Sequence, residues 1–119
     1  MTTHEHEKID YVELPSRDIQ ATKEFFGELF GWCFQDYGPD YTAFANQGLD
    51  GGFFKAEQAA STSNGSALIV FYSRHLEATR DNVARAGGVI VKPIFTFPGG
   101  RRFHFTDPGG SEFAVWSDL

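Results

Sequence analysis

The amino-acid sequence predicts an α+β protein built from two βαβββ modules. Three observations lead to this prediction: period-two segments alternate with segments of helical period, the same order of elements occurs twice, and one constant offset relates the two halves. We expect a flexible N-terminus at 1–7 and a single domain at 8–119. Within that domain we expect the first module at about 8–56, a linker at about 57–66 and the second module at about 67–117.

The first strand is expected over residues 9–14. In an extended segment, Val12 and Leu14 lie on one side, and Tyr11 and Glu13 lie on the other. The strand is therefore expected to present Val12 and Leu14 on one face of a sheet, and Tyr11 and Glu13 on the other.

A helix is expected to follow, because Ser16 and Asp18 can cap its N-terminus and Gly31 can end it in a left-handed conformation. One helical face carries its apolar positions, which are Ile19, Thr22, Phe26, Leu29 and Phe30. Three short aromatic-rich strands are expected next, separated by turn residues, at 32–37, 41–46 and 52–55.

The second module repeats this order. Residues 57–66 are small and polar, which is typical of a linker. A strand is then expected at 67–73, followed by a helix that ends at Gly87 and Gly88 and whose apolar face comprises Leu76, Thr79, Val83 and Ala86. Three strands follow at 89–94, 102–106 and 112–116, and the sequence DPGG forms the turn between the last two.

A single offset of 57 residues relates the two halves. It matches strand, helix face, helix end and turn in the pairs Val12 and Ile69, Ile19 and Leu76, Thr22 and Thr79, Gly31 and Gly88, Phe34 and Val91, and Asp50 and Asp107. A common offset over so many elements indicates an internal repeat.

Composition excludes several classes of function. The formal net charge of −6 disfavours nucleic acid as a partner, because phosphate binding needs clustered cations. No segment has the ~20 consecutive apolar residues of a membrane span, and the charged start has no signal-peptide pattern, so a cytoplasmic protein without a membrane partner is expected. The single cysteine cannot form an intrachain disulfide. Aromatic residues make up 16% of the chain, which indicates a bulky core, an aromatic pocket, or both.

Two segments resemble the vicinal oxygen chelate superfamily, which includes glyoxalase I, bleomycin-resistance proteins and extradiol dioxygenases. They are LPSRDIQATKEFFGELFGW, which begins at Leu14, and FHFTDPGGSEFAVW, which begins at Phe103. The resemblance implies a glyoxalase-like fold of cup-shaped mixed sheets with the helices outside, and a homodimer that binds a small molecule inside the cups. It also implies, for catalytic members, a divalent metal held by His on the first strand and Glu on the last strand of each module.

The sequence departs from that ligand pattern. Alignment on the family motifs places Tyr11 and Leu68 at the two histidine positions, and it places Ala114 and the run 51–54 at the two glutamate positions. These side chains do not make a transition-metal site, so we expect no metal and no cofactor. A shifted alignment that recruits Glu13 and Glu112 as ligands remains an alternative.

We therefore expect the chain to bind or sequester a small organic molecule in a metal-free aromatic cup at a dimer interface. The acidic charge favours a cationic or neutral guest. The candidate ligand-binding residues are Tyr11, Glu13, Tyr41, Phe54, Leu68, Arg102, Phe103, His104, Glu112, Ala114 and Trp116.

The alternative is an enzyme related to lactoylglutathione lyase, acting as a lyase, isomerase or dioxygenase through Glu13, Glu112 and His104. Glu13 and His104 are the catalytic candidates, because a carboxylate and an imidazole are the usual acids and bases. Two other roles stay open: Glu13 could bond a neighbouring Tyr or a partner's Arg, and His104 could lie at a rim or interface.

Overall fold

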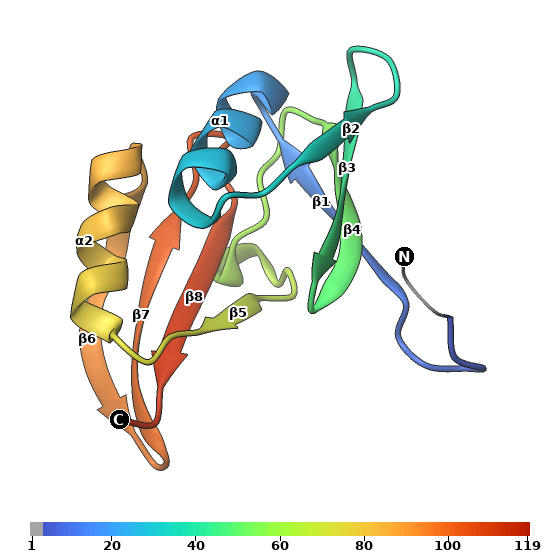
Figure 1. The fold of residues 1–119 in the computed structure, drawn as a ribbon. Helices are drawn as coiled ribbons and strands as arrows, with labels where there is room; N and C mark the ends of the chain where they lie inside the picture. The colour runs from blue at the N-terminus through green and yellow to red at the C-terminus, as the bar shows by residue number, and fades with distance from the viewer. Residues whose placement is uncertain (1–3) are drawn as a thin grey trace.

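The computed structural model describes residues 4–119 and confirms the α+β architecture of two βαβββ modules (Figure 1). The first module comprises β1 (Tyr11–Ser16), α1 (Ile19–Phe30), β2 (Phe34–Asp36), β3 (Tyr41–Gln47) and β4 (Leu49–Lys55). A short 3-10 helix, η1 (Thr62–Asn64), lies in the linker. The second module comprises β5 (Ile69–Tyr72), α2 (Leu76–Ala86), β6 (Val89–Phe97), β7 (Gly100–Thr106) and β8 (Glu112–Ser117). Of the N-terminus expected to be flexible, 1–3 lie outside the described residues and 4–7 are exposed.

Each module forms its own four-stranded mixed sheet, in the orders β1-β4-β3-β2 and β5-β8-β7-β6. The first strand of each module runs parallel to the last, and the other neighbours are antiparallel. Within the described residues, the strands at both ends of each sheet, which are β1, β2, β5 and β6, pair on one side only, so each leaves one edge open. No described helix has the length and apolar character needed to cross a membrane.

The helix ends follow the sequence signals. Asp18 is the N-cap of α1, and its side chain accepts a hydrogen bond from the Ala21 N–H. Gly31 ends the helix with a φ of 74°, a conformation that glycine adopts without a Cβ clash. Ser16 lies nearby but bonds the hydroxyl of Thr22 at 2.7 Å. The expected cap and end of the helix are therefore confirmed.

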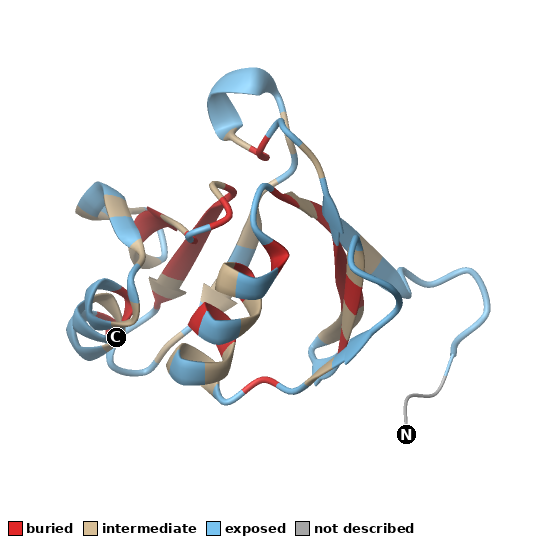
Figure 2. Ribbon diagram, turned by 90° about the horizontal axis from the view of Figure 1, so that it is seen from above, coloured by how far each residue is buried: buried red, intermediate tan, exposed pale blue. Residues whose placement is uncertain are grey.

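One hydrophobic core joins the two modules. Phe26 of α1 is fully buried, and its ring lies 5.7 Å from that of Phe53 in the first sheet and 5.3 Å from that of Phe113 in the second. Helix α1 thus lies between the sheets, and buried residues gather around it from both sides (Figure 2). Since each sheet turns one face to this shared core, the other face of each sheet points outward.

The 57-residue offset holds at the start of each module but fails at its end. Ile19 and Leu76 are both first helical residues, and Val12 and Ile69 both lie in first strands. Asp50, however, lies in β4, whereas Asp107 lies in the turn before β8 and accepts a hydrogen bond from the Ser111 N–H. The pairing of Asp50 with Asp107 was therefore wrong, because β6 and β7 form a longer hairpin than β2 and β3.

Candidate functional site

The sequence-predicted site residues fall mainly on two outward sheet faces. The first sheet carries what we name the tyrosine face, which consists of Tyr11, Glu13, Tyr41 and Phe54. The second sheet carries the histidine face, which consists of Arg102, His104, Glu112, Ala114 and Trp116. No described contact joins the two faces within one chain.

Two candidates belong to neither face. Phe103 is fully buried in the core, because β7 alternates and Arg102 and His104 occupy its outward side. Its expected place in an aromatic ligand lining was wrong for that reason. Leu68 precedes β5 and lines an apolar cavity of about 330 Å³ between the modules, together with Val12 and Trp32.

Hydrogen bonds connect the side chains of the tyrosine face. Tyr41 Oη donates to Glu13 Oε2 at 2.8 Å, and the hydroxyls of Tyr11 and Tyr41 lie 2.7 Å apart. Because the Tyr41 hydroxyl hydrogen is used in the bond to Glu13, Tyr11 is the hydrogen-bond donor to Tyr41. Burial raises the pKa of Tyr41, and the bonds from Tyr11 and to Glu13 raise it further. Glu13 is thus bonded to a neighbouring tyrosine, which was one of the roles that the sequence left open for it.

A glycine makes this arrangement possible. Tyr41 lies on β3 and must cross β4 to reach Glu13 on β1. The β4 residue in its path is Gly52, and a Cβ there would lie 2.2 Å from the Tyr41 hydroxyl oxygen. Gly52 therefore provides space on the tyrosine face and is not part of a turn.

The histidine face holds a buried imidazole–carboxylate pair. His104 is 1% exposed, and its Nδ1 lies 2.7 Å from Glu112 Oε2. The other carboxylate oxygen, Oε1, accepts hydrogen bonds from Thr62 N at 2.8 Å and Thr62 Oγ1 at 3.0 Å. Burial raises the pKa of Glu112, but the bonds from His104 and Thr62 outweigh it, so the net shift of that pKa is downward.

The charge of Glu112 determines which nitrogen of His104 carries a proton. An ionised carboxylate only accepts hydrogen bonds, so His104 Nδ1 must donate. In the neutral imidazole, Nε2 then carries a free lone pair. Nε2 is buried and has no hydrogen-bond partner among the described residues. With His104 in its neutral form, the pair therefore presents one unsatisfied acceptor.

Aromatic rings extend from this pair across the second sheet. Tyr72 on β5 lies 5.2 Å from Trp116 on β8 between ring centroids, and Trp116 lies 6.3 Å from Phe97 on β6. Phe97 was expected in a loop after residue 94, but β6 continues to Phe97 and brings its ring onto the sheet. The period-two spacing of the two phenylalanines at 95 and 97 was the signal that could have placed them.

A cation lies beside these aromatic rings on the second sheet, which we name the ring row. The Arg102 guanidinium lies 5.7 Å from the ring centre of Phe97 and 5.4 Å from that of Phe95, within the range of a cation–π interaction. Phe95 in turn lies 5.9 Å from the His104 ring. Arg102 Nε is buried without a hydrogen-bond partner among the described residues. By contrast, the neighbouring Arg101 points to the helix side, where it pairs with Glu77 of α2.

The residues do not fit the metal that the family resemblance implies. Ala114 pairs with His104 in the second sheet, and the corresponding position of the first sheet, opposite Ala43, is Gly52; neither has a ligand atom. Glu13 and Glu112, the alternative ligands, lie on different sheets with other partners. Across residues 4–119, no three His, Cys, Asp or Glu side chains are grouped for a metal.

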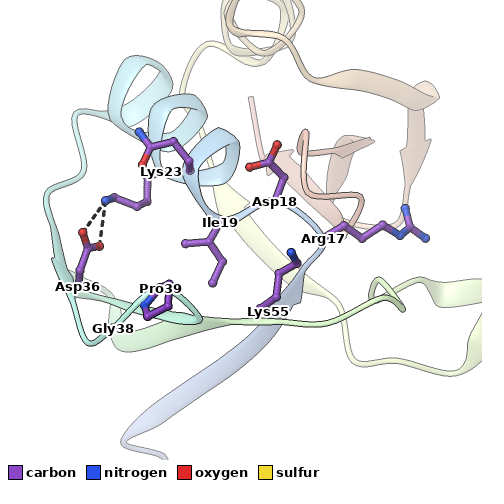
Figure 3. Close-up of a pocket in the computed structure, with 9 residues that line it drawn as sticks. Arg17, Asp18, Ile19, Lys23, Asp36, Gly38, Pro39 and Lys55 are labelled. Atoms are coloured by element: carbon purple, nitrogen blue, oxygen red, sulfur yellow. Dashed lines mark hydrogen bonds and ion pairs between the residues drawn. The ribbon is translucent and has the colours of Figure 1, made fainter.

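A second cavity, of about 430 Å³, lies beside the start of α1 (Figure 3). Two of its three cationic side chains, those of Lys23 and Arg17, are already engaged. Lys23 pairs with Asp36 at 2.8 Å, and Arg17 Nε donates to the Glu57 carbonyl at 2.8 Å. Figure 3 shows Lys23 turned toward Asp36 and Arg17 extending away from the pocket. The histidine face is the stronger candidate site, because it holds two buried polar atoms that have no hydrogen-bond partner among the described residues.

Comparison with known proteins agrees with the fold. Residues 8–115 match the family model described as the Glyoxalase/Bleomycin resistance protein/Dioxygenase superfamily. Two relatives are 30% identical over 124 residues: "Anthracycline biosynthesis protein DauV" of Streptomyces sp. (strain C5) and "Anthracycline biosynthesis protein DnrV" of Streptomyces peucetius. Each alignment covers 89% of this chain but 45% of the relative, so the chain spans about half their length.

Two solved structures share the fold at low identity. A glyoxalase-related enzyme from Fulvimarina pelagi has a TM-score of 0.76 at 22% identity, with 93% of this chain and 88% of that chain covered. Lactoylglutathione lyase from Agrobacterium tumefaciens has a TM-score of 0.70 at 15% identity, with 93% of both chains covered. At these identities the likeness establishes the fold alone.

Proposed function

Because the chain belongs to the glyoxalase/bleomycin resistance/dioxygenase superfamily, we propose that it binds a small planar aromatic molecule in a cup completed by a second copy. The observation that carries this proposal is the row of rings and the Arg102 cation on the outward face of the second sheet. Such a row offers stacking area to a flat guest. The names of DauV and DnrV add support, because anthracyclines are polycyclic aromatic compounds.

The open strand edges support a homodimer. β1 and β5 each leave one edge unpaired, and they carry Tyr11, Val70 and Tyr72 with 42%, 42% and 48% of their surface exposed. Long exposed apolar edges are usually covered in native proteins. A second copy with its β5 against β1 would bring its histidine face opposite the tyrosine face. A two-fold dimer would contain two such cups.

Light scattering coupled to gel filtration tests the dimer. We expect the dimer mass for the wild type and the monomer mass for V70K, because a lysine on the open β5 edge disfavours strand pairing. V89K is the matched control, since Val89 is also exposed, at 59%, but lies on β6 at the far side of the sheet. A monomeric wild type, or the same mass for both variants, would contradict the proposed interface.

Quenching of tryptophan fluorescence tests ligand binding. Trp116 lies in the ring row, whereas Trp32 is 8% exposed in the core. We expect the neutral probe 2-methoxyanthraquinone to quench wild-type emission saturably, and W116F to lose most of that change. An absence of saturable quenching up to the solubility limit of the probe would refute the proposal.

A second candidate function, acid–base catalysis, is favoured by the His104–Glu112 pair. A carboxylate-bonded imidazole can remove a proton from carbon next to a carbonyl group. Exchange of the C–H protons of dihydroxyacetone in D₂O, followed by NMR, tests it. Exchange above buffer with the wild type and not with H104Q would support catalysis, and equal rates for both proteins would exclude it for this probe.

A further inference from the structure

We propose that His104 and Arg102 form a subsite for a phenolic hydroxyl group on the planar ligand. This inference rests on the proposed function and names the chemical class of its guest. Its basis is that two unsatisfied polar atoms, His104 Nε2 and Arg102 Nε, belong to side chains on one sheet face that both lie against the ring of Phe95. His104 Nε2 can accept a proton, and Arg102 Nε donates a hydrogen bond. A hydroxyl oxygen that loses its proton needs this combination.

The acceptor is oriented by contacts on its far side. Glu112 accepts a hydrogen bond from His104 Nδ1 at 2.7 Å and is itself fixed by both bonds from Thr62. This arrangement holds the imidazole with its Nε2 lone pair away from the carboxylate. A buried acceptor without a partner destabilises the ligand-free protein. A ligand whose O–H group donates to this acceptor removes that free-energy cost and therefore binds more tightly.

Arg102 both covers the subsite and completes it. Its described contacts are with the rings of Phe95 and Phe97, and neither is an ion pair or a hydrogen bond. Its side chain can therefore shift along the rings to admit a ligand at lower cost than a salt-bridged arginine. A guanidinium that then meets the ligand oxygen makes a charge-assisted hydrogen bond.

The bound state follows from a single proton transfer. The phenolic O–H bond breaks, and its proton forms a new N–H bond at His104 Nε2. The resulting imidazolium donates from Nδ1 to the Glu112 carboxylate, which balances its charge. The phenolate oxygen keeps the electron pair and accepts a hydrogen bond from Arg102. The ligand enters as a neutral molecule, which avoids repulsion from a chain with a net charge of −6.

Two probes that differ by one methyl group test the subsite. These probes are 2-hydroxyanthraquinone and 2-methoxyanthraquinone. Binding is measured at a pH at which the absorption spectrum of the free hydroxy probe shows that its hydroxyl group is protonated. We expect the wild type to bind the hydroxy probe about tenfold more tightly than the ether. We also expect the bound hydroxy probe to show the longer-wavelength absorption of a phenolate.

Three substitutions and one matched control assign the effect. H104Q is expected to abolish both the tighter binding of the hydroxy probe and the phenolate absorption. R102Q is expected to weaken binding of the hydroxy probe more than binding of the ether. R101Q is the matched control, because Arg101 is adjacent in sequence but faces α2, and it should behave as the wild type. E112Q gives a second test that removes the negative charge while retaining the shape, and we expect it to lose the phenolate absorption.

The outcomes separate this inference from the proposed function. Equal affinity for both probes, with the neutral spectrum retained, would overturn the subsite and leave planar-ring binding standing. Failure of both probes to bind would overturn both. A phenolate signal that persists in both H104Q and E112Q would place the proton acceptor elsewhere and refute the assignment to His104.

Discussion

The Gly52→Ala substitution tests the physical reason for the tyrosine face. The new methyl group would lie 2.2 Å from the Tyr41 hydroxyl oxygen, so the Tyr41 side chain must leave its position across β4. Its departure breaks the hydrogen bonds to Glu13 and Tyr11. At about 0.5–1.5 kcal/mol for each bond, we expect the free energy of unfolding to fall by about 1–3 kcal/mol.

A double-mutant cycle isolates this effect. In a Y41A background the side chain that meets the methyl group is absent, while the contact with the Thr42 carbonyl, at 2.9 Å, remains in both backgrounds and cancels. We therefore expect urea denaturation to give a coupling energy of about 1–3 kcal/mol between G52A and Y41A. G27A is the control, because Gly27 lies in α1 and should be additive with Y41A. Additivity of G52A and Y41A within about 0.5 kcal/mol would refute the reasoning.

Two further predictions concern stability. F26A should lower the free energy of unfolding by about 3–5 kcal/mol and leave one unfolding transition, because the Phe26 ring contacts both sheets. Urea denaturation followed by two probes checks this, and a loss of stability below about 1 kcal/mol would contradict it. The hydrogen bond from Arg101 is the main reason that the pKa of Glu77 falls from its ordinary value of 4.5 to about 2. Because this folded-state pKa is depressed, the stabilisation is present above about pH 4.5 and is lost as the pH falls toward 2. E77Q should therefore show a shallower loss of stability with falling pH over that range, and equal slopes would contradict this.

Local signals were sufficient for most of the fold. Asp18 and Gly31 predicted both ends of α1, because capping depends on a few adjacent residues. The alternation of β7 placed His104 opposite two core phenylalanines, as expected from the period of a strand. The same alternation excludes Phe103 from a ligand surface that contains Arg102, so that misassignment could have been avoided from the sequence.

The partners of the site residues could not be predicted in this way. The hydrogen bond between Glu112 and Thr62 joins β8 to the linker. The Tyr41 side chain on β3 reaches Glu13 on β1 only because the β4 residue between them is Gly52. These contacts link residues 28 and 50 positions apart. Their geometry depends on sheet order and register, which no local pattern specifies.

The sequence by itself determined the two βαβββ modules, the ends of α1, and the side of each strand on which most candidate residues lie. Periodicity and capping are short-range properties, so the printed residues are enough to deduce them. Only the tertiary structure decided that the two candidate faces point away from each other and that His104 keeps an unsatisfied Nε2. The physical reason is that both facts depend on how α1 packs between two sheets and on which distant groups that packing brings within hydrogen-bond distance.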